Sequence, residues 1–304
     1  MALPLILDTD IGDDVDDAFA ILLAALEPAL SLVAVTTVYG DAPHRARIAR
    51  KLLDLAGRPD VPVAVGHGNT LTGHDPLASQ APGTEMSSGR GFVAPPGSVE
   101  WNALGARLHP EPAVDLIIRT VSEAAEPPVV AAIGPLTNLA AALRRAPEMA
   151  RRARAVALMG GRLGAEAALG EHNFNSDPEA TRIVLESGAR LLIGTYEVTM
   201  QARIGIAELP RLRAGTPACR ATADQLERYL TARNRTATSM YDPLSLTLAY
   251  TDRYLSTMPV ALATTIADRR VHLRLAAGAP PTAHVTTALD APAFVDYLLA
   301  TIGA

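Results

Sequence analysis

The chain has 304 residues, of which 49% are hydrophobic and 19% charged, so it can bury a large core and is not expected to be disordered. Its net charge of −5, without a basic stripe, argues against a nucleic-acid partner. Cys219 is the only cysteine, which excludes an internal disulfide and a thiolate zinc site.

The chain opens with an apolar run at residues 5–7, which predicts a buried strand, followed by a sharp turn at Gly12 and a helix that begins at Asp14. Six aspartates fall in the ten residues around this turn: Asp8, Asp10, Asp13, Asp14, Asp16 and Asp17. Capping of the helix explains one of them, because an N-cap needs a single side-chain oxygen. The others repel one another unless a cation compensates their charge, and ligands that are all oxygen favour Ca²⁺ or Mg²⁺ over zinc.

Strands and helices then alternate, which predicts an α/β fold with a mostly parallel sheet, helices on both faces, and a single domain over residues 1–304. The further predicted strands are residues 32–38, 61–65, 129–133, 155–159 and 191–194. The further predicted helices are residues 46–56, 113–125, 178–187, 218–234 and 290–302, with two more that begin at Pro135 and near Asp242. Short β-branched pieces within residues 258–287 are expected to pair as hairpins.

Two stretches have no such periodicity. Residues 66–100 are rich in Gly, Pro, Ser and Thr, and we expect them to form a flap near the site, while residues 162–177 form a second, polar loop. In parallel sheets the site lies at the carboxyl ends of the strands. Asp10 and Asp41 follow two consecutive predicted strands, so we expect both in one pocket.

Several other classes of protein are excluded by what the chain does not contain. Lys51 is the only lysine and lies in a helical stretch, which argues against a Schiff-base lysine, and a GxxxxGK[ST] phosphate-binding loop is absent. No apolar run reaches the roughly 18 residues of a membrane span, so we expect no membrane association. A strand that begins near residue 3 leaves no room for a signal peptide, and we expect a cytoplasmic enzyme.

Six segments resemble, in order, motifs of the nucleoside hydrolases of the inosine–uridine type: ILDTDIGDDVDDAFAI, TTVYGD, AIGPLTNLA, LMGG, EHNFNSDPEA and YDPL. The resemblance covers nearly the whole chain. It implies a Rossmann-like open sheet and hydrolysis of the N-glycosidic bond of ribonucleosides to ribose and free base. It also implies a Ca²⁺ that binds the ribose hydroxyls and the attacking water, and a homo-oligomer, either a dimer or a tetramer.

The resemblance also assigns roles to individual residues. The implied calcium ligands are the carboxylates of Asp10, Asp17 and Asp242 and the backbone carbonyl of Ile133. The implied ribose contacts are Asp16, Asp41, Glu171 and Asn173. Asp10 is also the implied base that takes the proton from water. These types of residue suit the reaction, because carboxylates stabilise the positive charge of an oxocarbenium-like transition state.

The chain departs from the family pattern at several points. Its aspartate motif is two residues longer than DxDPGxDD, so either Asp14 or Asp16 contacts the ribose, and a gap that aligns the final DDA favours Asp16. Tyr241 stands where some members carry a histidine that protonates the leaving base, and a phenol of pKa about 10 is a poorer acid. Asp41 replaces a common asparagine, and the loop after Met159 is shorter.

Two other functions remain as hypotheses. The ILDTD segment is similar to the start of haloacid-dehalogenase-type phosphatases, but Gly12 stands where their chemistry needs Thr or Val. A riboside-binding protein without catalysis is the other alternative, because Tyr241 replaces the expected acid.

Overall fold

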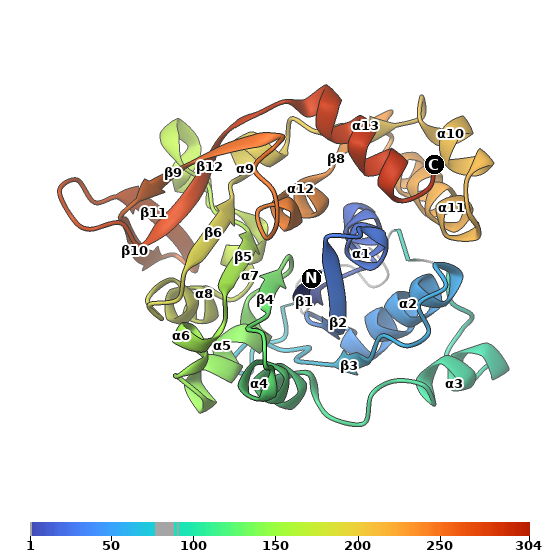
Figure 1. Ribbon diagram of the computed structural model, residues 1–304, viewed down its shortest axis with the longest axis horizontal. Helices are drawn as coiled ribbons and strands as arrows, with labels where there is room; N and C mark the ends of the chain where they lie inside the picture. The colour runs from blue at the N-terminus through green and yellow to red at the C-terminus, as the bar shows by residue number, and fades with distance from the viewer. Residues whose placement is uncertain (1, 77–87, 90) are drawn as a thin grey trace.

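The computed structural model of the protein describes residues 2–76, 88, 89 and 91–304, and within them the main sheet has eight strands (Figure 1). In spatial order these are β3 (Val63–Val65), β2 (Leu30–Thr37), β1 (Leu3–Thr9), β4 (Val129–Ala132), β5 (Ala155–Met159), β6 (Leu191–Gly194), β12 (Ala283–Leu289) and β9 (Leu255–Val260). Neighbouring strands are parallel except for β9, which runs antiparallel to β12 at the edge. The predicted fold class is confirmed.

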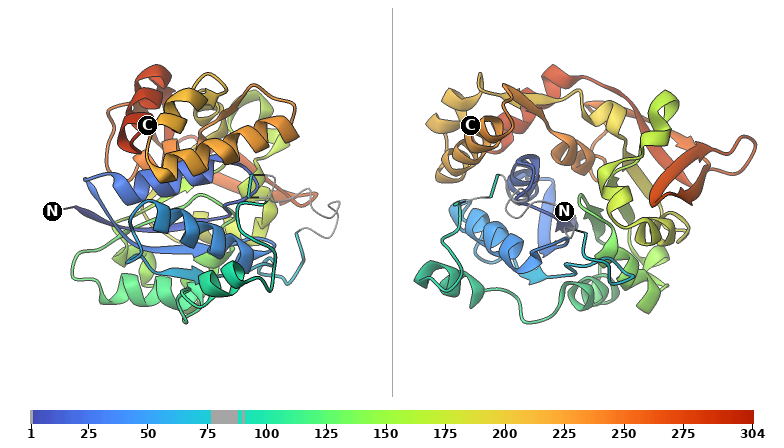
Figure 2. Two further views of the ribbon diagram at one scale, coloured as in Figure 1. Left: turned by 90° about the vertical axis from the view of Figure 1, so that its right-hand side faces the viewer. Right: turned by 180° about the vertical axis from the view of Figure 1, so that it is seen from behind.

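Helices cover both faces of this sheet (Figure 2). One face carries α1 (Asp16–Leu26), α2 (Ala42–Leu55), α11 (Pro217–Ala232), α12 (Tyr241–Thr247) and α13 (Ala291–Thr301). The other face carries α4 (Ala113–Glu123), α5 (Thr137–Arg145), α6 (Met149–Arg152) and α8 (Pro178–Leu185). Side chains alternate along β1, so Leu5 and Leu7 join the first apolar cluster and Ile6 joins the second.

Shorter elements connect these layers. They are α3 (Val99–Gly105), the 3₁₀ helix η1 (Gly164–Leu169), α7 (His172–Ser176), α9 (Tyr196–Thr199) and α10 (Leu209–Ala214). Two antiparallel strand pairs stand apart from the main sheet: β7 (Arg203–Gly205) with β8 (Ala237–Ser239), and β10 (Leu262–Ala267) with β11 (Arg270–Leu275). Among the described residues, no helix combines the length and the apolar character needed to cross a membrane.

The structure corrects three expectations. The first helix begins at Asp16, two residues later than predicted, because the chain around Gly12 and Asp14 is bonded to Ser88 instead of entering the helix. The predicted pairing of short strands as hairpins is confirmed for β10 and β11, but β9 and β12 pair with each other inside the main sheet. The α3 helix begins at Val99, in the last two residues of the predicted flap, and residues 77–87 and 90 lie outside the described residues.

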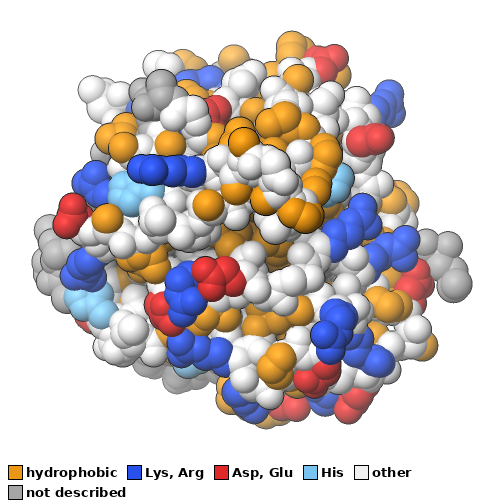
Figure 3. Space-filling view, turned by 90° about the vertical axis from the view of Figure 1, so that its left-hand side faces the viewer, with side chains coloured by type: hydrophobic (Ala, Val, Ile, Leu, Met, Phe, Trp, Pro, Cys, Tyr) orange, Lys and Arg blue, Asp and Glu red, His pale blue; other side chains and the backbone are white. Residues whose placement is uncertain are grey.

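The β10–β11 hairpin extends beyond the end of the main sheet, close to the edge strand β9 (Figure 1). Three apolar side chains of these strands are exposed: Met258 by 40%, Ile266 by 42% and Leu275 by 55%. Figure 3 looks onto this end of the molecule, where hydrophobic side chains lie among arginines. These strands therefore expose apolar surface at this end of the molecule.

The last helix should unfold together with the first strand. Phe294 of α13 is fully buried in the same apolar cluster as Leu5 and Phe19. Phe294→Ala should lower the free energy of unfolding by about 3–5 kcal/mol, because it leaves a large cavity. Calorimetry should still show a single transition, as one domain requires.

The matched control for this prediction is Val99→Ala, at a side chain that is 88% exposed. This variant should change the free energy of unfolding by less than about 0.5 kcal/mol. Two separate transitions in the wild-type chain would contradict the single domain.

Candidate active site

Three buried carboxylates meet at the beginnings of two helices. Asp16 and Asp17 open α1, Asp242 lies in the first turn of α12, and one oxygen of each lies within 4.8 Å of the other two. The backbone N–H of Asp242 donates to Asp16 Oδ2 at 3.2 Å, and the Thr9 hydroxyl donates to Asp17 Oδ1 at 2.5 Å. Burial, and then the neighbouring carboxylates, raise the pKa of all three well above the ordinary range. Such a set of oxygen donors fits a hard cation, because a cation would replace repulsion with attraction.

Asp10 lies beside this group, at the end of β1, and its negative charge contributes to the raised pKa of all three carboxylates. It is buried, and the end of β4 packs against it so closely that a Cβ on Gly134 would stand 2.7 Å from Asp10 Oδ1. Burial raises the pKa of Asp10 to about 6, although the Arg45 guanidinium opposes the shift. A carboxyl with this pKa is ionised at neutral pH and can still accept a proton.

Asp8 lies on β1, two residues before Asp10, and its carboxylate accepts two hydrogen bonds. The Thr36 hydroxyl donates to Asp8 Oδ1 at 2.5 Å, and Asn138 Nδ2 donates to the same oxygen at 2.8 Å. Asn138 Oδ1 in turn accepts the backbone N–H of His67 at 2.9 Å. Burial raises the pKa of Asp8 to about 7. Sequence patterns did not reveal these bonds of Asn138, because its partners lie far away in the sequence, on β1 and in the segment after β3.

The loop before α8 brings Glu171 and Asn173 to the same edge of the sheet. Both are buried, and Glu171 caps α7 by accepting the backbone N–H groups of Asn173 at 3.0 Å and Phe174 at 3.1 Å. Asn173 Nδ2 donates to the carbonyl oxygen of Ile133 at 2.8 Å. The loop packs tightly, because a Cβ on Gly160 would overlap the ring of Phe174. The structure thus brings three of the predicted site residues together.

Asp41 and Tyr241 are less enclosed. Asp41 is exposed and caps α2, where its Oδ1 accepts the backbone N–H of His44 at 3.1 Å. Tyr241 is half-buried and stacks on Tyr196, with ring centroids 5.7 Å apart. Burial raises the pKa of Tyr241 to about 12, so the phenol stays protonated at neutral pH.

Residues 5–296 match the family described as inosine-uridine preferring nucleoside hydrolase. The chain belongs to this family. An uncharacterised protein of Schizosaccharomyces pombe is 37% identical over 217 residues, which are 69% of this chain and 66% of that protein. The pyrimidine-specific ribonucleoside hydrolase RihA of Salmonella enteritidis is 33% identical over 235 residues, which are 76% of this chain and 72% of that protein.

A solved structure is similar along the whole fold. The purine-preferring ribonucleoside hydrolase from Gardnerella vaginalis has a TM-score of 0.84 and 27% identity, with 98% of each chain covered. The predicted family, fold class and class of enzyme, an N-ribosyl hydrolase that acts on ribonucleosides, are therefore confirmed. The family match also favours this assignment over the haloacid-dehalogenase-type phosphatase.

In this nucleoside hydrolase the longer aspartate motif is accommodated before α1. Asp16 belongs to the buried group of three carboxylates, whereas Asp14 is only half-buried and lies in the preceding turn. The phenol of Tyr229 bonds to Asp14, which contributes to a raised pKa of Tyr229 after the larger effect of burial. The gapped alignment, in which Asp16 and Asp17 form the final acidic pair, stays a prediction.

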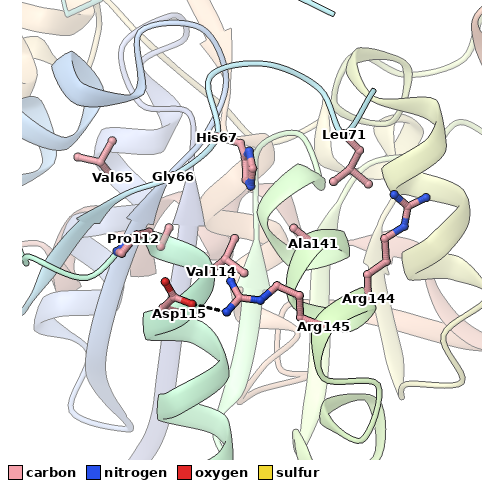
Figure 4. Close-up of a pocket in the computed structure, with 11 residues that line it drawn as sticks. Val65, Gly66, His67, Leu71, Pro112, Val114, Asp115, Ala141, Arg144 and Arg145 are labelled. Atoms are coloured by element: carbon pink, nitrogen blue, oxygen red, sulfur yellow. Dashed lines mark hydrogen bonds and ion pairs between the residues drawn. The ribbon is translucent and has the colours of Figure 1, made fainter. Parts of the chain in front are cut away.

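A separate cavity of about 520 Å³ lies away from this nucleoside hydrolase site (Figure 4). Its walls come from residues 65–71, the start of α4 and the outer part of α5, and Asp115 pairs with Arg145 there at 2.5 Å. None of the aspartates of the acidic motif lines it, nor does Asp242. The cavity therefore lies outside the group of buried carboxylates.

The metal-free protein should become less stable as the pH rises from about 4 to about 7. Burial raises the pKa of Asp8 from 3.8 to about 7 and that of Asp10 to about 6. In this window the folded state holds protons that the unfolded state has released, so the free energy of unfolding falls with increasing pH. Urea unfolding in a chelator, at about pH 5 and about pH 8, measures the difference.

Calcium added at the higher pH should restore the lost stability, because it would bind the ionised carboxylates of the folded state. A metal-free protein that is equally stable at both pH values would contradict the raised pKa values.

Proposed function

We propose that this nucleoside hydrolase cleaves ribonucleosides with Ca²⁺ as its cofactor, giving ribose and free base. The observation that carries the proposal is the burial of Asp16, Asp17 and Asp242 within 4.8 Å of one another, with Asp10 beside them. The relative named as pyrimidine-specific and the structural neighbour named as purine-preferring both act on ribonucleosides, which supports this class of substrate.

Four oxygen ligands would hold the ion: the carboxylates of Asp10, Asp17 and Asp242 and the carbonyl of Ile133. The Ile133 oxygen already accepts a bond from Asn173, but a carbonyl has a second lone pair. Asp16 lies close enough to Asp17 and Asp242 to share their cation, and we propose that it also faces the ribose. When bound, the ion supplies positive charge that lowers the pKa of water in the site.

In the proposed reaction Asp10 accepts a proton from the attacking water. The water oxygen bonds to the anomeric carbon while the bond from this carbon to the base nitrogen breaks, and the bonding electron pair leaves with the base. The departing base then takes up a proton from solvent water, and Asp10 returns its proton to solvent. The carboxylate of Asp16 stabilises the positive charge on the sugar ring. Asp41, Glu171 and Asn173 contact the ribose hydroxyls.

Tyr241 acts on the leaving base as a hydrogen-bond donor in this proposal. Its pKa of about 12 keeps the proton on the phenol at neutral pH, which suits donation of a hydrogen bond better than transfer of the proton. The stacked ring of Tyr196 fixes its orientation. The same feature motivates the alternative of a riboside-binding protein, because no stronger acid has been assigned to this position.

We also propose a cytoplasmic homo-oligomer of two or four copies. The exposed apolar residues Met258, Ile266 and Leu275 support association of copies. The single, buried Cys219 suits a reducing compartment.

Asp10→Ala should abolish turnover, raising the barrier by several kcal/mol, because the base and one cation ligand are lost together. Release of ribose from a panel of purine and pyrimidine ribonucleosides, with calcium present, measures this effect. Asp115→Asn, in the separate cavity of Figure 4, is the matched control and should retain wild-type activity.

The wild-type protein provides the decisive comparison. Failure to cleave any nucleoside of the panel would contradict the proposed activity. Tight binding of a nucleoside without turnover would instead identify a riboside-binding protein.

Tyr241→Phe should lower kcat about two- to tenfold, because one hydrogen bond of about 0.5–1.5 kcal/mol to the leaving base is lost. Steady-state kinetics with a single nucleoside measures the change. Tyr196→Phe, which alters the stacked neighbour, should lower kcat much less. An unchanged kcat in Tyr241→Phe would remove Tyr241 from the reaction.

A further inference from the structure

Arg45 of α2 is fully buried beside the acidic turn, and its guanidinium donates to four oxygens. Nε donates to the carbonyl of Tyr39 at 2.6 Å. Nη1 donates to the carbonyls of Asp10 and Ile11, the latter at 3.1 Å. Nη2 donates to Asp13 Oδ2 at 2.9 Å, which makes an ion pair. One side chain therefore bonds to the chain that follows β1 and to the chain that follows β2.

Three of the four acceptors belong to residues 10–13, where the chain must leave β1 and present its carboxylates. The planar guanidinium has fixed directions for its N–H groups, so it sets the relative positions of the oxygens it binds. The carbonyl of Asp10 is among them, and the backbone position of this residue sets the position of its side-chain carboxylate. The fourth acceptor, Tyr39, has a φ of 74°, a left-handed conformation that is unfavourable for a tyrosine.

The positive charge of Arg45 also affects the binding of a cation at the site. The carboxylates of Asp13, Asp10 and Asp17 together raise the pKa of Arg45 although burial alone would lower it, so the group stays charged. A lone positive charge here would oppose a cation bound by Asp10 and Asp17. The Asp13 carboxylate, 2.9 Å from Arg45 Nη2, offsets that charge.

We propose that Arg45 is a positioning residue for the cation site and that Asp13 is its obligatory partner. The inference rests on the proposed calcium-dependent function. It explains the longer aspartate motif of this chain, because Asp13 lies in the extended turn and bonds to Arg45 across 32 residues of sequence. In this arrangement the ion pair holds the turn without contacting the substrate.

The same helix provides a matched control. Arg50 of α2 has a side chain that is 2% exposed, and its guanidinium donates to the carbonyls of Val61 at 2.6 Å and Arg58 at 2.8 Å and to Asp54 at 3.1 Å. It thus has the burial and the bonding of Arg45 but lies away from the acidic turn. Arg50→Lys should lower stability and leave calcium affinity unchanged.

Calorimetric titration with Ca²⁺ tests the proposal on the full chain, with thermal unfolding recorded for each variant. Arg45→Lys keeps the positive charge but loses the planar guanidinium with its several N–H donors. Asp13→Asn keeps that guanidinium but removes the negative charge that compensates it. Each should raise the calcium Kd by about 10–100-fold, the range found when residues that orient metal ligands are changed. The double variant should raise the calcium Kd by less than the product of the two single effects, because both residues act through one contact.

Kinetics at saturating calcium should restore most of the kcat of both variants, because neither side chain takes part in the reaction. Calcium affinities of Arg45→Lys and Asp13→Asn equal to that of Arg50→Lys would overturn the proposal. If Arg45→Lys does not fold, Asp13→Asn decides alone, since its side chain is 24% exposed and the change is small. A wild-type protein that binds no calcium would instead refute the proposed cofactor, and the positioning role with it.

Discussion

Repulsion among carboxylates buried at the end of β1 is the constraint on which the rest of the structure depends. The repulsion between two like charges about 4 Å apart costs about 4 kcal/mol at an effective dielectric constant of about 20. Several such pairs together rival the whole stability of a domain, about 5–15 kcal/mol. Asp16, Asp17 and Asp242 nevertheless share one buried corner with Asp10 beside them. A folded protein tolerates this repulsion only where it is compensated by bound protons, by a cation or by a fixed positive charge.

The layered sheet explains how these groups meet. Parallel strands end at one edge, so the segments that follow β1, β2, β4 and β5 are neighbours although they are far apart in sequence. The first turn of α12 adds Asp242 from the opposite end of the chain, and its N–H bonds to Asp16. Large apolar clusters on both faces of the sheet hold these ends in place, so the stability of the core maintains the strained corner.

Polar residues around the site extend this support to other elements. Asp177, in the same loop as Glu171, caps α8 through the N–H of Ala180. Its second oxygen accepts the Leu71 N–H and the Thr137 hydroxyl, each at 2.8 Å. One buried carboxylate thus joins the loop before α8 to the segment that follows β3 and to the start of α5. The segment EHNFNSDP therefore serves both the site and the scaffold.

The sequence alone determined the alternation of strands and helices, the acidic motif at the first turn and the family, because these features depend on local periodicity and on short spacings. It also indicated Glu171, Asn173 and Asp242, which the fold brings to one edge of the sheet. Only the tertiary structure decided that β9 and β12 join the main sheet and that α1 begins at Asp16. It also decided that Arg45 bonds to Asp13 in the turn after β1 and that Asn138 bonds to Asp8 on β1. A pattern shows which face of an element is buried, but not which distant side chain it meets there.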